Sequence, residues 1–299
     1  MPSCGRHDLG RRVGAADVST DIRALAIRFA DLWAVDPHQM VDEVYAADIL
    51  MESMADPARV IDGAADLHAL EDQLAARIPD HRHELIRVVV GDGVACLETT
   101  VVAPRSGEYA PACVWWWIDA DGFVGAEVGW FDWDVRTTDA AVSHGTVPPS
   151  SRVGGAHDDA WYRAVAEDYA HRWAHDPTGA GTLARFAPNC TSARVGAPEL
   201  HGIDQLALAR ARQLAELPVP GRRMEVQQVL GEEAVVAMLV VLGDDRRVTR
   251  GTVVLTVGAD GLIASERRYW DWTKAVPMDG RDARRAVGSP GWSLDGRRS

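Results

Sequence analysis

The 299-residue sequence contains a single lysine, Lys274, and no apolar run close to the roughly 20 residues that a membrane-spanning helix needs. The N-terminal residues include Arg6, Arg11 and Arg12 and lack the apolar core of a signal peptide. We therefore expect a cytoplasmic protein with no membrane partner.

The charge of the chain also argues against a nucleic-acid-binding surface. The formal net charge is -13, which repels phosphate backbones, and no basic stripe with interleaved aromatics offsets it locally. We expect no nucleic-acid partner.

Metal and cofactor motifs are missing as well. The four cysteines are scattered with no CxxC spacing, so neither a zinc site nor a disulfide framework is indicated. His171 and His175 lie four residues apart, but Asp176-Pro177 ends the helix there and no HExxH pattern is present. Without a P-loop, a nucleophile elbow or a dinucleotide fingerprint, we expect chemistry without metal or cofactor.

A long internal repeat is the main positive feature. Residues 129–133 (GWFDW) recur 139 residues later as residues 268–272 (RYWDW), and Gly63 pairs with Gly202 at the same offset. Repeats of this length indicate two related domains, because solenoid repeats span only about 20 to 50 residues. We predict a mobile extension at 1–20, domains at 21–136 and 158–276, a linker at 137–157 and a tail at 277–299.

Both copies predict the same element order: helix, short helix, strand, helix and four strands joined by hairpins. In the first copy the helices are expected at 21–33, 40–45 and 65–77, and the strands at 49–53, 83–90, 94–102, 112–118 and 123–133. The second copy predicts strands at 190–195, 224–230, 234–242, 247–257 and 262–272. The expected fold class is α+β: two cone-shaped domains, each a curved, mostly antiparallel sheet wrapped on about three helices.

This element order, the helix-Asp-Pro and Gly landmarks, and the terminal aromatic motifs resemble the nuclear transport factor 2-like superfamily, especially its SnoaL-like polyketide cyclase branch. The superfamily also includes ketosteroid isomerases, epoxide hydrolases and non-catalytic binders, so fold alone names no reaction. Its members often pair sheet to sheet. The resemblance therefore implies that the sister domains pair within the chain as a pseudo-dimer, and it leaves a homodimer of whole chains open.

The resemblance also implies roles for particular residues. The aspartate of the last strand, which cyclases and epoxide hydrolases use to handle a proton, falls on Asp132 and Asp271. The substrate-binding tyrosine of ketosteroid isomerases falls on Tyr169 and on Phe29. Two of the three ketosteroid isomerase roles have no matching residue in either copy, so that reaction is not expected.

The second copy has the more polar expected pocket and is therefore expected to carry the chemistry. Its catalytic candidates are Asp271, Tyr169, Arg268, Arg194 and Glu266, with Asp132 as the candidate of the first copy. The predicted substrate-binding residues are Phe29, Tyr45, Trp115, Trp117, Phe131, His171 and Trp270.

Strand periodicity leaves two choices open. If Phe131 faces the pocket, Glu127 shares its face and Asp132 points away, which makes Glu127 and Glu266 alternative acid-base groups. In the same way, the pocket receives either Trp115 and Trp117 or Trp116.

These observations predict a cofactor-independent acid-base enzyme of the cyclase or isomerase type. Its substrate would be a hydrophobic, polyketide-like or polycyclic small molecule of bacterial secondary metabolism. The alternatives are an epoxide hydrolase or epoxide-opening cyclase, and a non-catalytic small-molecule-binding or scaffold protein whose pockets are filled or ion-paired.

Overall fold

The computed structural model describes residues 15–138, 157–176, 178–216 and 222–278. The expected extension before residue 15, most of the expected linker and the tail beyond residue 278 lie outside these residues. Helix α1 begins at Ala15, six residues before the expected start at residue 21.

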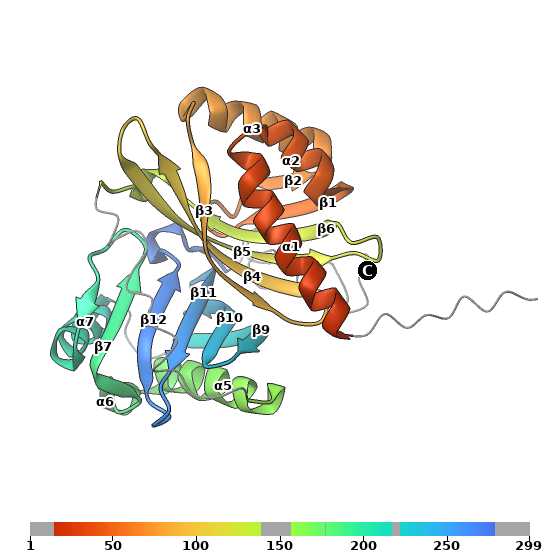
Figure 1. Ribbon diagram of the computed structural model, residues 1–299. Coiled ribbons are helices and arrows are strands. Elements are labelled where there is room, and N and C mark those ends of the chain that lie inside the picture. Colours follow the sequence, from red (N-terminus) through yellow and green to blue (C-terminus); the bar gives the residue numbers. More distant parts are fainter. Residues whose placement is uncertain (1–14, 139–156, 177, 217–221, 279–299) are drawn as a thin grey trace, which may run out of the picture.

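The first half of the chain consists of helices on one side of a six-stranded sheet (Figure 1). Helix α1 lies against β3, and α3 lies against β1 and β2. The elements are α1 (Ala15–Trp33), α2 (Pro37–Val44), β1 (Tyr45–Ser53), β2 (Val60–Asp62), α3 (Ala64–Arg77), β3 (Arg82–Val90), β4 (Val94–Ala103), β5 (Glu108–Ile118), β6 (Val124–Phe131) and the 3-10 turn η1 (Trp133–Val135).

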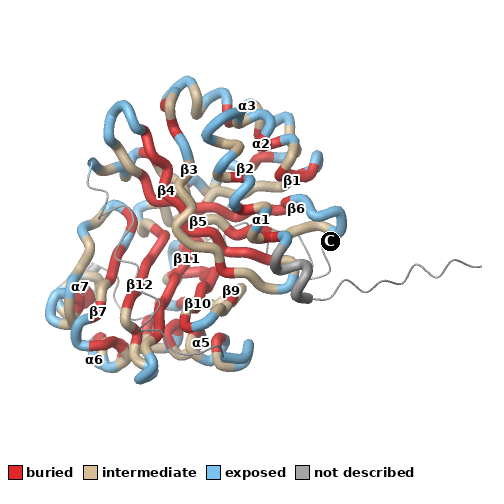
Figure 2. The backbone as a smooth tube through the Cα atoms, in the orientation of Figure 1, coloured by how far each residue is buried: buried red, intermediate tan, exposed pale blue. Residues whose placement is uncertain are grey.

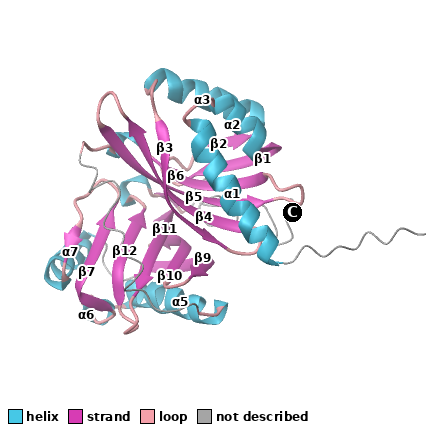
Figure 3. Cartoon of the chain, viewed as in Figure 1, coloured by secondary structure: helices cyan, strands magenta, loops and turns pink. Residues whose placement is uncertain are grey.

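The second half repeats this plan with a sheet of seven strands. Its elements are α5 (Asp159–His175), α6 (Ala180–Leu183), β7 (Phe186–Arg194), β8 (Leu200–His201), α7 (Ile203–Glu216), β9 (Arg223–Glu232), β10 (Val235–Gly243), β11 (Arg247–Val257), β12 (Ile263–Tyr269), the 3-10 turn η3 (Trp272–Lys274) and β13 (Val276–Pro277). The described part of the chain is therefore a mixed α+β structure with two sheets and six α-helices (Figure 3).

Strand order is the same in both sheets. It is β2-β1-β6-β5-β4-β3 in the first and β8-β7-β12-β11-β10-β9 in the second, with β13 added beside β11. The β1–β6 and β7–β12 pairs are parallel, whereas the other pairs are antiparallel. The short strands β2 and β8 were not predicted, because two or three residues carry no periodic signal.

Local side-chain contacts explain several element boundaries. Asp36 caps α2 by accepting the amides of His38 and Gln39, each at 3.0 Å, and Pro37 fits the first helical position. The last strands end two or three residues earlier than predicted, at Phe131 and Tyr269. There the following aspartates turn the chain into η1 and η3.

Apolar side chains from both sheets meet in one buried cluster between them, where Figure 2 shows buried strands on both sides. Trp115 of β5 donates its indole Nε1 proton to Thr252 Oγ1 of β11 at 2.9 Å. Tyr269 donates its hydroxyl to Glu98 at 2.8 Å, and Arg267 lies 3.2 Å from the same carboxylate. Each sheet thus has one face toward the other sheet and one face toward its own helices.

Within the described ranges, none of the helices combines the length and apolar character required to cross a bilayer. Cys96, Cys113 and Cys190 are buried free thiols.

Candidate functional site

The first half contains a cavity of about 430 Å³ between its helices and the helical face of its sheet. Phe29 of α1 and Glu71 of α3 line it, together with Glu127, Gly129 and Phe131 of β6. Alternate residues of β6 reach the cavity because successive side chains of a strand point to opposite faces. Small-molecule sites usually have volumes of about 300 to 1,000 Å³, so this cavity has a suitable size.

Glu127 is a buried acid in the cavity wall. Its Oε2 accepts the hydroxyl proton of Tyr45 and the indole proton of Trp116, each at 2.8 Å. Burial raises the pKa of Glu127 to about 7, and the two hydrogen bonds offset only part of that rise. A carboxyl group that titrates near neutral pH can accept a proton from a substrate and return it.

Glu71 is a second acid on the opposite wall, and sequence reasoning missed it. Its side chain is buried, and its Oε2 has no hydrogen-bond partner in the described part of the structure. Burial and the nearby charge of Glu127 raise the pKa of Glu71 to about 8, and a hydrogen bond with Trp33 offsets only part of that rise. A signal was present: Leu67, Leu70 and Leu74 form an apolar helix face, and Glu71 interrupts it.

The wall beside these acids is aromatic and carries no positive charge. Trp33 stacks on His83 with 3.5 Å between ring centroids and donates its indole proton to His81 at 2.9 Å. Burial, with a smaller contribution from His81, holds the pKa of His83 well below its usual range. Burial also lowers the pKa of His81. Both rings are therefore neutral at physiological pH.

Residues of the second half complete the rim of the cavity. Lys274, at the end of η3, lines it and lies 3.0 Å from Asp132 Oδ2. The hydrogen bond with Asp132 is the main cause of the raised pKa of Lys274. Glu52 also lines the cavity and pairs with Arg250 of β11 at 2.7 Å. Two rim carboxylates thus have cationic partners from the other half.

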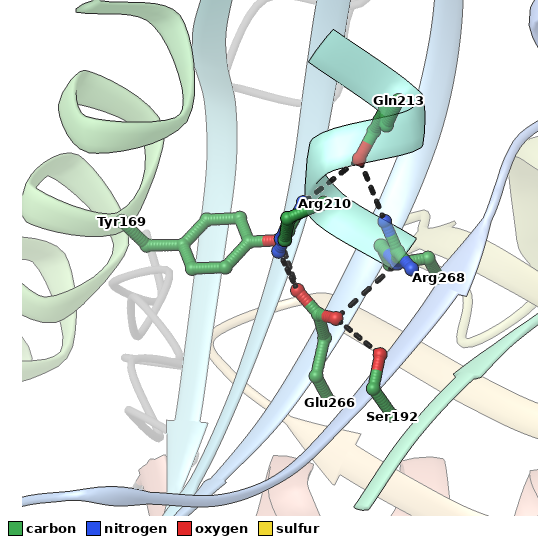
Figure 4. Close-up of polar contacts among 6 residues, drawn as sticks. All are labelled: Tyr169, Ser192, Arg210, Gln213, Glu266 and Arg268. Atoms are coloured by element: carbon green, nitrogen blue, oxygen red, sulfur yellow. Dashed lines mark hydrogen bonds and ion pairs between the residues drawn. The ribbon is translucent and has the colours of Figure 1, made fainter. Parts of the chain in front are cut away.

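The equivalent site of the second half has a different character (Figure 4). Glu266 is fully buried and accepts hydrogen bonds from Tyr169, from Ser192 at 2.5 Å and from Arg210 at 2.7 Å. Arg268 lies 3.3 Å from the same carboxylate. Burial alone would raise the pKa of Glu266, but the two guanidinium groups and the hydrogen bonds lower it to about 2. Glu266 is therefore a permanent anion in an ion-paired cluster.

Matching positions explain the contrast between the halves. Helices α3 and α7 each have 14 residues, and Glu71 and Arg210 are both the eighth. Gly129 and Arg268 both stand two residues after the buried glutamate of the last long strand. A Cβ atom at Gly129 would lie 3.2 Å from Glu127 Oε1, whereas Arg268 extends its whole side chain at that place. Two arginines of the second half thus stand at the positions that Glu71 and Gly129 hold in the first half.

Cavities beside this cluster are correspondingly small. One of about 20 Å³ lies beside Tyr169, and one of about 10 Å³ lies beside Arg210. Neither could contain more than a water molecule or two. The expectation that the second half has the open polar pocket is therefore wrong, because its polar side chains neutralise one another and fill the space.

The three consecutive tryptophans of β5 do not lie as the substrate-binding prediction placed them, because Trp116 faces the helices and its two neighbours face the other sheet. Trp115 and Trp117 belong to the apolar cluster between the sheets, and Trp116 faces the helices and bonds to Glu127. Trp115 and Trp117 are therefore corrected from substrate contacts to sheet-packing residues. Three other predicted substrate-binding residues, Phe29, Tyr45 and Phe131, line the cavity.

Three predicted residues of the second half lie away from any cavity described above. His171 is exposed and stacks on His175, and Arg194 is exposed at the end of β7. Trp270 packs edge-on against Trp173 in the core of the second half. None of these three side chains is available to a ligand at Glu127.

The two aspartates that follow the last strands act as caps. Asp132 Oδ1 accepts the amide of Asp134, and Asp271 Oδ1 accepts the amide of Thr273, each at 2.9 Å. Asp132 also lines the cavity at its rim beside Lys274. Both aspartates lie one or two residues beyond the end of a strand. The alternation of side chains along a strand therefore does not determine which way they point.

No set of three or more His, Cys, Asp or Glu side chains within the described ranges is arranged to hold a metal ion.

No protein-family model and no curated protein matches the chain. Solved structures similar to part of the chain include SnoaL-like proteins and a de novo designed protein with a curved β-sheet. A member of the SnoaL-like family from Agrobacterium tumefaciens strain C58 aligns with 38% of this chain and 98% of its own, at 14% identity and a TM-score of 0.33. A SnoaL-like protein of unknown function from Burkholderia thailandensis E264 aligns with 39% of this chain and 99% of its own, at 15% identity and a TM-score of 0.34. A SnoaL-like protein from Jannaschia sp. CCS1 aligns with 46% of this chain and 100% of its own, at 14% identity and a TM-score of 0.35. Likeness at this level assigns no substrate or reaction to the chain.

Proposed function

We propose that the first half is a cofactor-independent acid-base enzyme of the cyclase or isomerase type that acts on a hydrophobic small molecule. The observation that carries the proposal is the pair of buried carboxyl groups, Glu71 and Glu127, in a cavity of about 430 Å³ with aromatic walls. Polyketide-like and polycyclic substrates suit these walls, and opening of an epoxide would use the same acid.

Glu127 is the proposed acid-base residue. Tyr45 and Trp116 both bond to its Oε2, which fixes the carboxyl plane. On the side of Oε1, Gly129 has no side chain of its own, and the nearest other side chain is the apolar Val114. A substrate proton within hydrogen-bond reach of Oε1 can be removed and delivered to another atom of the same molecule. Exclusion of bulk water by the aromatic walls strengthens this transfer.

The second half supports the first as a folded scaffold in this proposal. The observation that favours a non-catalytic role is the ion-paired Glu266 cluster, beside which the described residues line cavities of only about 20 and 10 Å³. We propose that the two cone-shaped halves form an intrachain pseudo-dimer in which only the first half is catalytic.

Hydrogen-deuterium exchange of a hydrophobic ketone tests this function without knowledge of the natural substrate. The probe is 2-tetralone, and NMR in heavy water measures loss of the proton signal at the carbon next to the carbonyl. Removal of a general base costs about 100-fold or more, so Glu127→Gln should reduce exchange by that factor. The matched control is Asp72→Asn, which changes an exposed carboxylate next to Glu71 on α3. Equal exchange by the wild type and Glu127→Gln would remove Glu127 from the proposed role.

A further inference from the structure

The interior of the first cavity contains two acids and no cation. The lining residues that carry positive charge are Arg59, Arg77 and Lys274. Arg77 pairs with Asp134 at 2.7 Å, Lys274 pairs with Asp132, and Arg59 is exposed. The positive charges therefore stay at the solvent-facing rim.

The second half shows how the same scaffold accommodates a buried glutamate at this place. Guanidinium groups of Arg210 and Arg268 contact Glu266 from the positions that Glu71 and Gly129 occupy in the first half. One carboxylate is thus matched by two cations. In the first half the balance is the opposite: two carboxyl groups face the cavity interior, and no cation accompanies them there.

Glu71 has the features of a ligand contact. It lines the cavity with 2% of its surface exposed, and its Oε2 has no hydrogen-bond partner in the described structure. A buried carboxyl oxygen without a partner is costly, and a partner from a ligand would offset that cost. An ammonium group beside Glu71 would lower its raised pKa and so favour the carboxylate form, for which a charged N–H donor is the strongest partner.

The walls favour the same kind of ligand. Phe29, Trp33 and Tyr45 line the cavity, and an aromatic ring attracts a cation that has left water and lies over its face. Neutral His83 adds no competing positive charge.

From this geometry, and resting on the proposed function, we propose that the substrate is a hydrophobic amine whose protonated nitrogen binds Glu71 while its carbon framework lies against the aromatic walls beside Glu127. The ammonium group supplies the charge that Arg210 and Arg268 supply in the second half. Glu71 then anchors the ligand, and Glu127 remains free to exchange a proton with it.

Three probes on one carbon framework test the charge requirement. Calorimetric titration with 2-aminotetralin, 2-tetralol and tetralin-2-carboxylate compares a cation, a neutral isostere and an anion. We expect the amine to bind at least about 10-fold more tightly than the alcohol, because hydrogen bonds to charged groups exceed neutral ones by about that factor. We expect no binding of the carboxylate. Equal affinity for the amine and the alcohol, or no binding of the amine, would overturn the proposal.

Two variants assign the contact to Glu71. Glu71→Gln should reduce affinity for the amine about 10-fold and change affinity for the alcohol less than about 3-fold, whereas Asp72→Asn should change neither. Glu71→Arg places the second-half residue in the first half, and we expect it to fold, since Glu127 gains a partner, and to lose amine binding entirely. Folding of both variants is checked by circular dichroism. Amine binding that survives in folded Glu71→Arg would contradict the proposal.

The proposed function and this inference fail separately. Loss of 2-tetralone exchange in Glu127→Gln tests proton transfer with a neutral probe, and the amine preference tests the ligand class. An enzyme that exchanges 2-tetralone but binds the alcohol as well as the amine would keep its proposed function and refute the amine.

Discussion

Substitution of the two equivalent glutamates should have opposite effects on stability. Glu127 and Glu266 occupy matching places in β6 and β12, and both are buried. Their partners differ, since Glu127 has neutral donors and Glu266 has two guanidinium groups. We compare Glu127→Gln with Glu266→Gln, which make the same chemical change.

Glu266→Gln leaves Arg210 and Arg268 buried without their anion. The two arginine side chains are only 5% and 6% exposed, so water cannot replace the carboxylate. The amide nitrogen of glutamine would also meet donors instead of acceptors. Removal of one partner from a buried ion pair costs about 3 to 5 kcal/mol, and we expect a loss of that order.

Glu127→Gln leaves no charge behind. Its amide oxygen can still accept from Tyr45 and Trp116, and its amide nitrogen faces the cavity. At about pH 5.5 the wild-type group is protonated and resembles the amide, so we expect a change within about 1 kcal/mol. At about pH 8.5 the wild type holds a buried carboxylate whose pKa rose from 4.5 to about 7. Removal of that carboxylate should stabilise the protein, by about 3 kcal/mol at most.

Urea denaturation followed by tryptophan fluorescence measures both variants at the two pH values. We expect Glu266→Gln to lower the free energy of unfolding strongly at both pH values. Glu127→Gln should leave it unchanged at pH 5.5 and raise it at pH 8.5. Equal destabilisation of both variants at pH 8.5 would refute the reasoning that different partners give the two glutamates different roles.

Two further predictions concern pH and the contact between the sheets. Glu71 and Glu127 have raised pKa values in the folded protein, so the folded state holds their protons more tightly than the unfolded state does. The free energy of unfolding is therefore highest below about pH 4.5, and this contribution should be lost as the pH rises through about 7 and 8. Thermal unfolding should therefore show a lower melting temperature at pH 8.5 than at pH 5.5, and the double variant Glu71→Gln with Glu127→Gln should flatten this slope. Thr252→Val keeps the shape of the side chain but leaves the buried Trp115 indole without its acceptor, and urea denaturation should show a loss of about 1 to 3 kcal/mol. No loss there would mean that another group accepts the indole proton.

Sequence periodicity predicted the parts of the fold that depend on local pattern. The repeat gave the shared element order, and alternation along residues 127–131 placed Glu127 and Phe131 on one face. The prediction failed where a strand ended early: Asp132 and Asp271 turn the chain, and alternation no longer applies after the turn.

Tertiary contacts decided what the sequence could not. The polar composition of the second copy suggested a pocket, but composition does not reveal whether polar groups face a ligand or one another. Arg210 was not among the candidates, and it is the residue that pairs with Glu266. Glu71 lies more than 50 residues from Glu127 in the sequence, so only the packing of α3 against the sheet brings both into one cavity.

Charges around the first cavity are distributed by depth, and the second half contributes to that distribution. Arg250 and Lys274 provide cations to Glu52 and Asp132 at the rim, and no residue of the second half lining the cavity reaches the interior acids. The rim pairs keep the walls in place without neutralising Glu127, because an arginine at interior depth would lower its pKa as Arg210 lowers that of Glu266. In the proposed function, Glu127 exchanges protons near pH 7, and this separation preserves the raised pKa that the exchange would use. The second half therefore stabilises the site through its rim and through the sheet behind it, while its own buried glutamate has become part of its core.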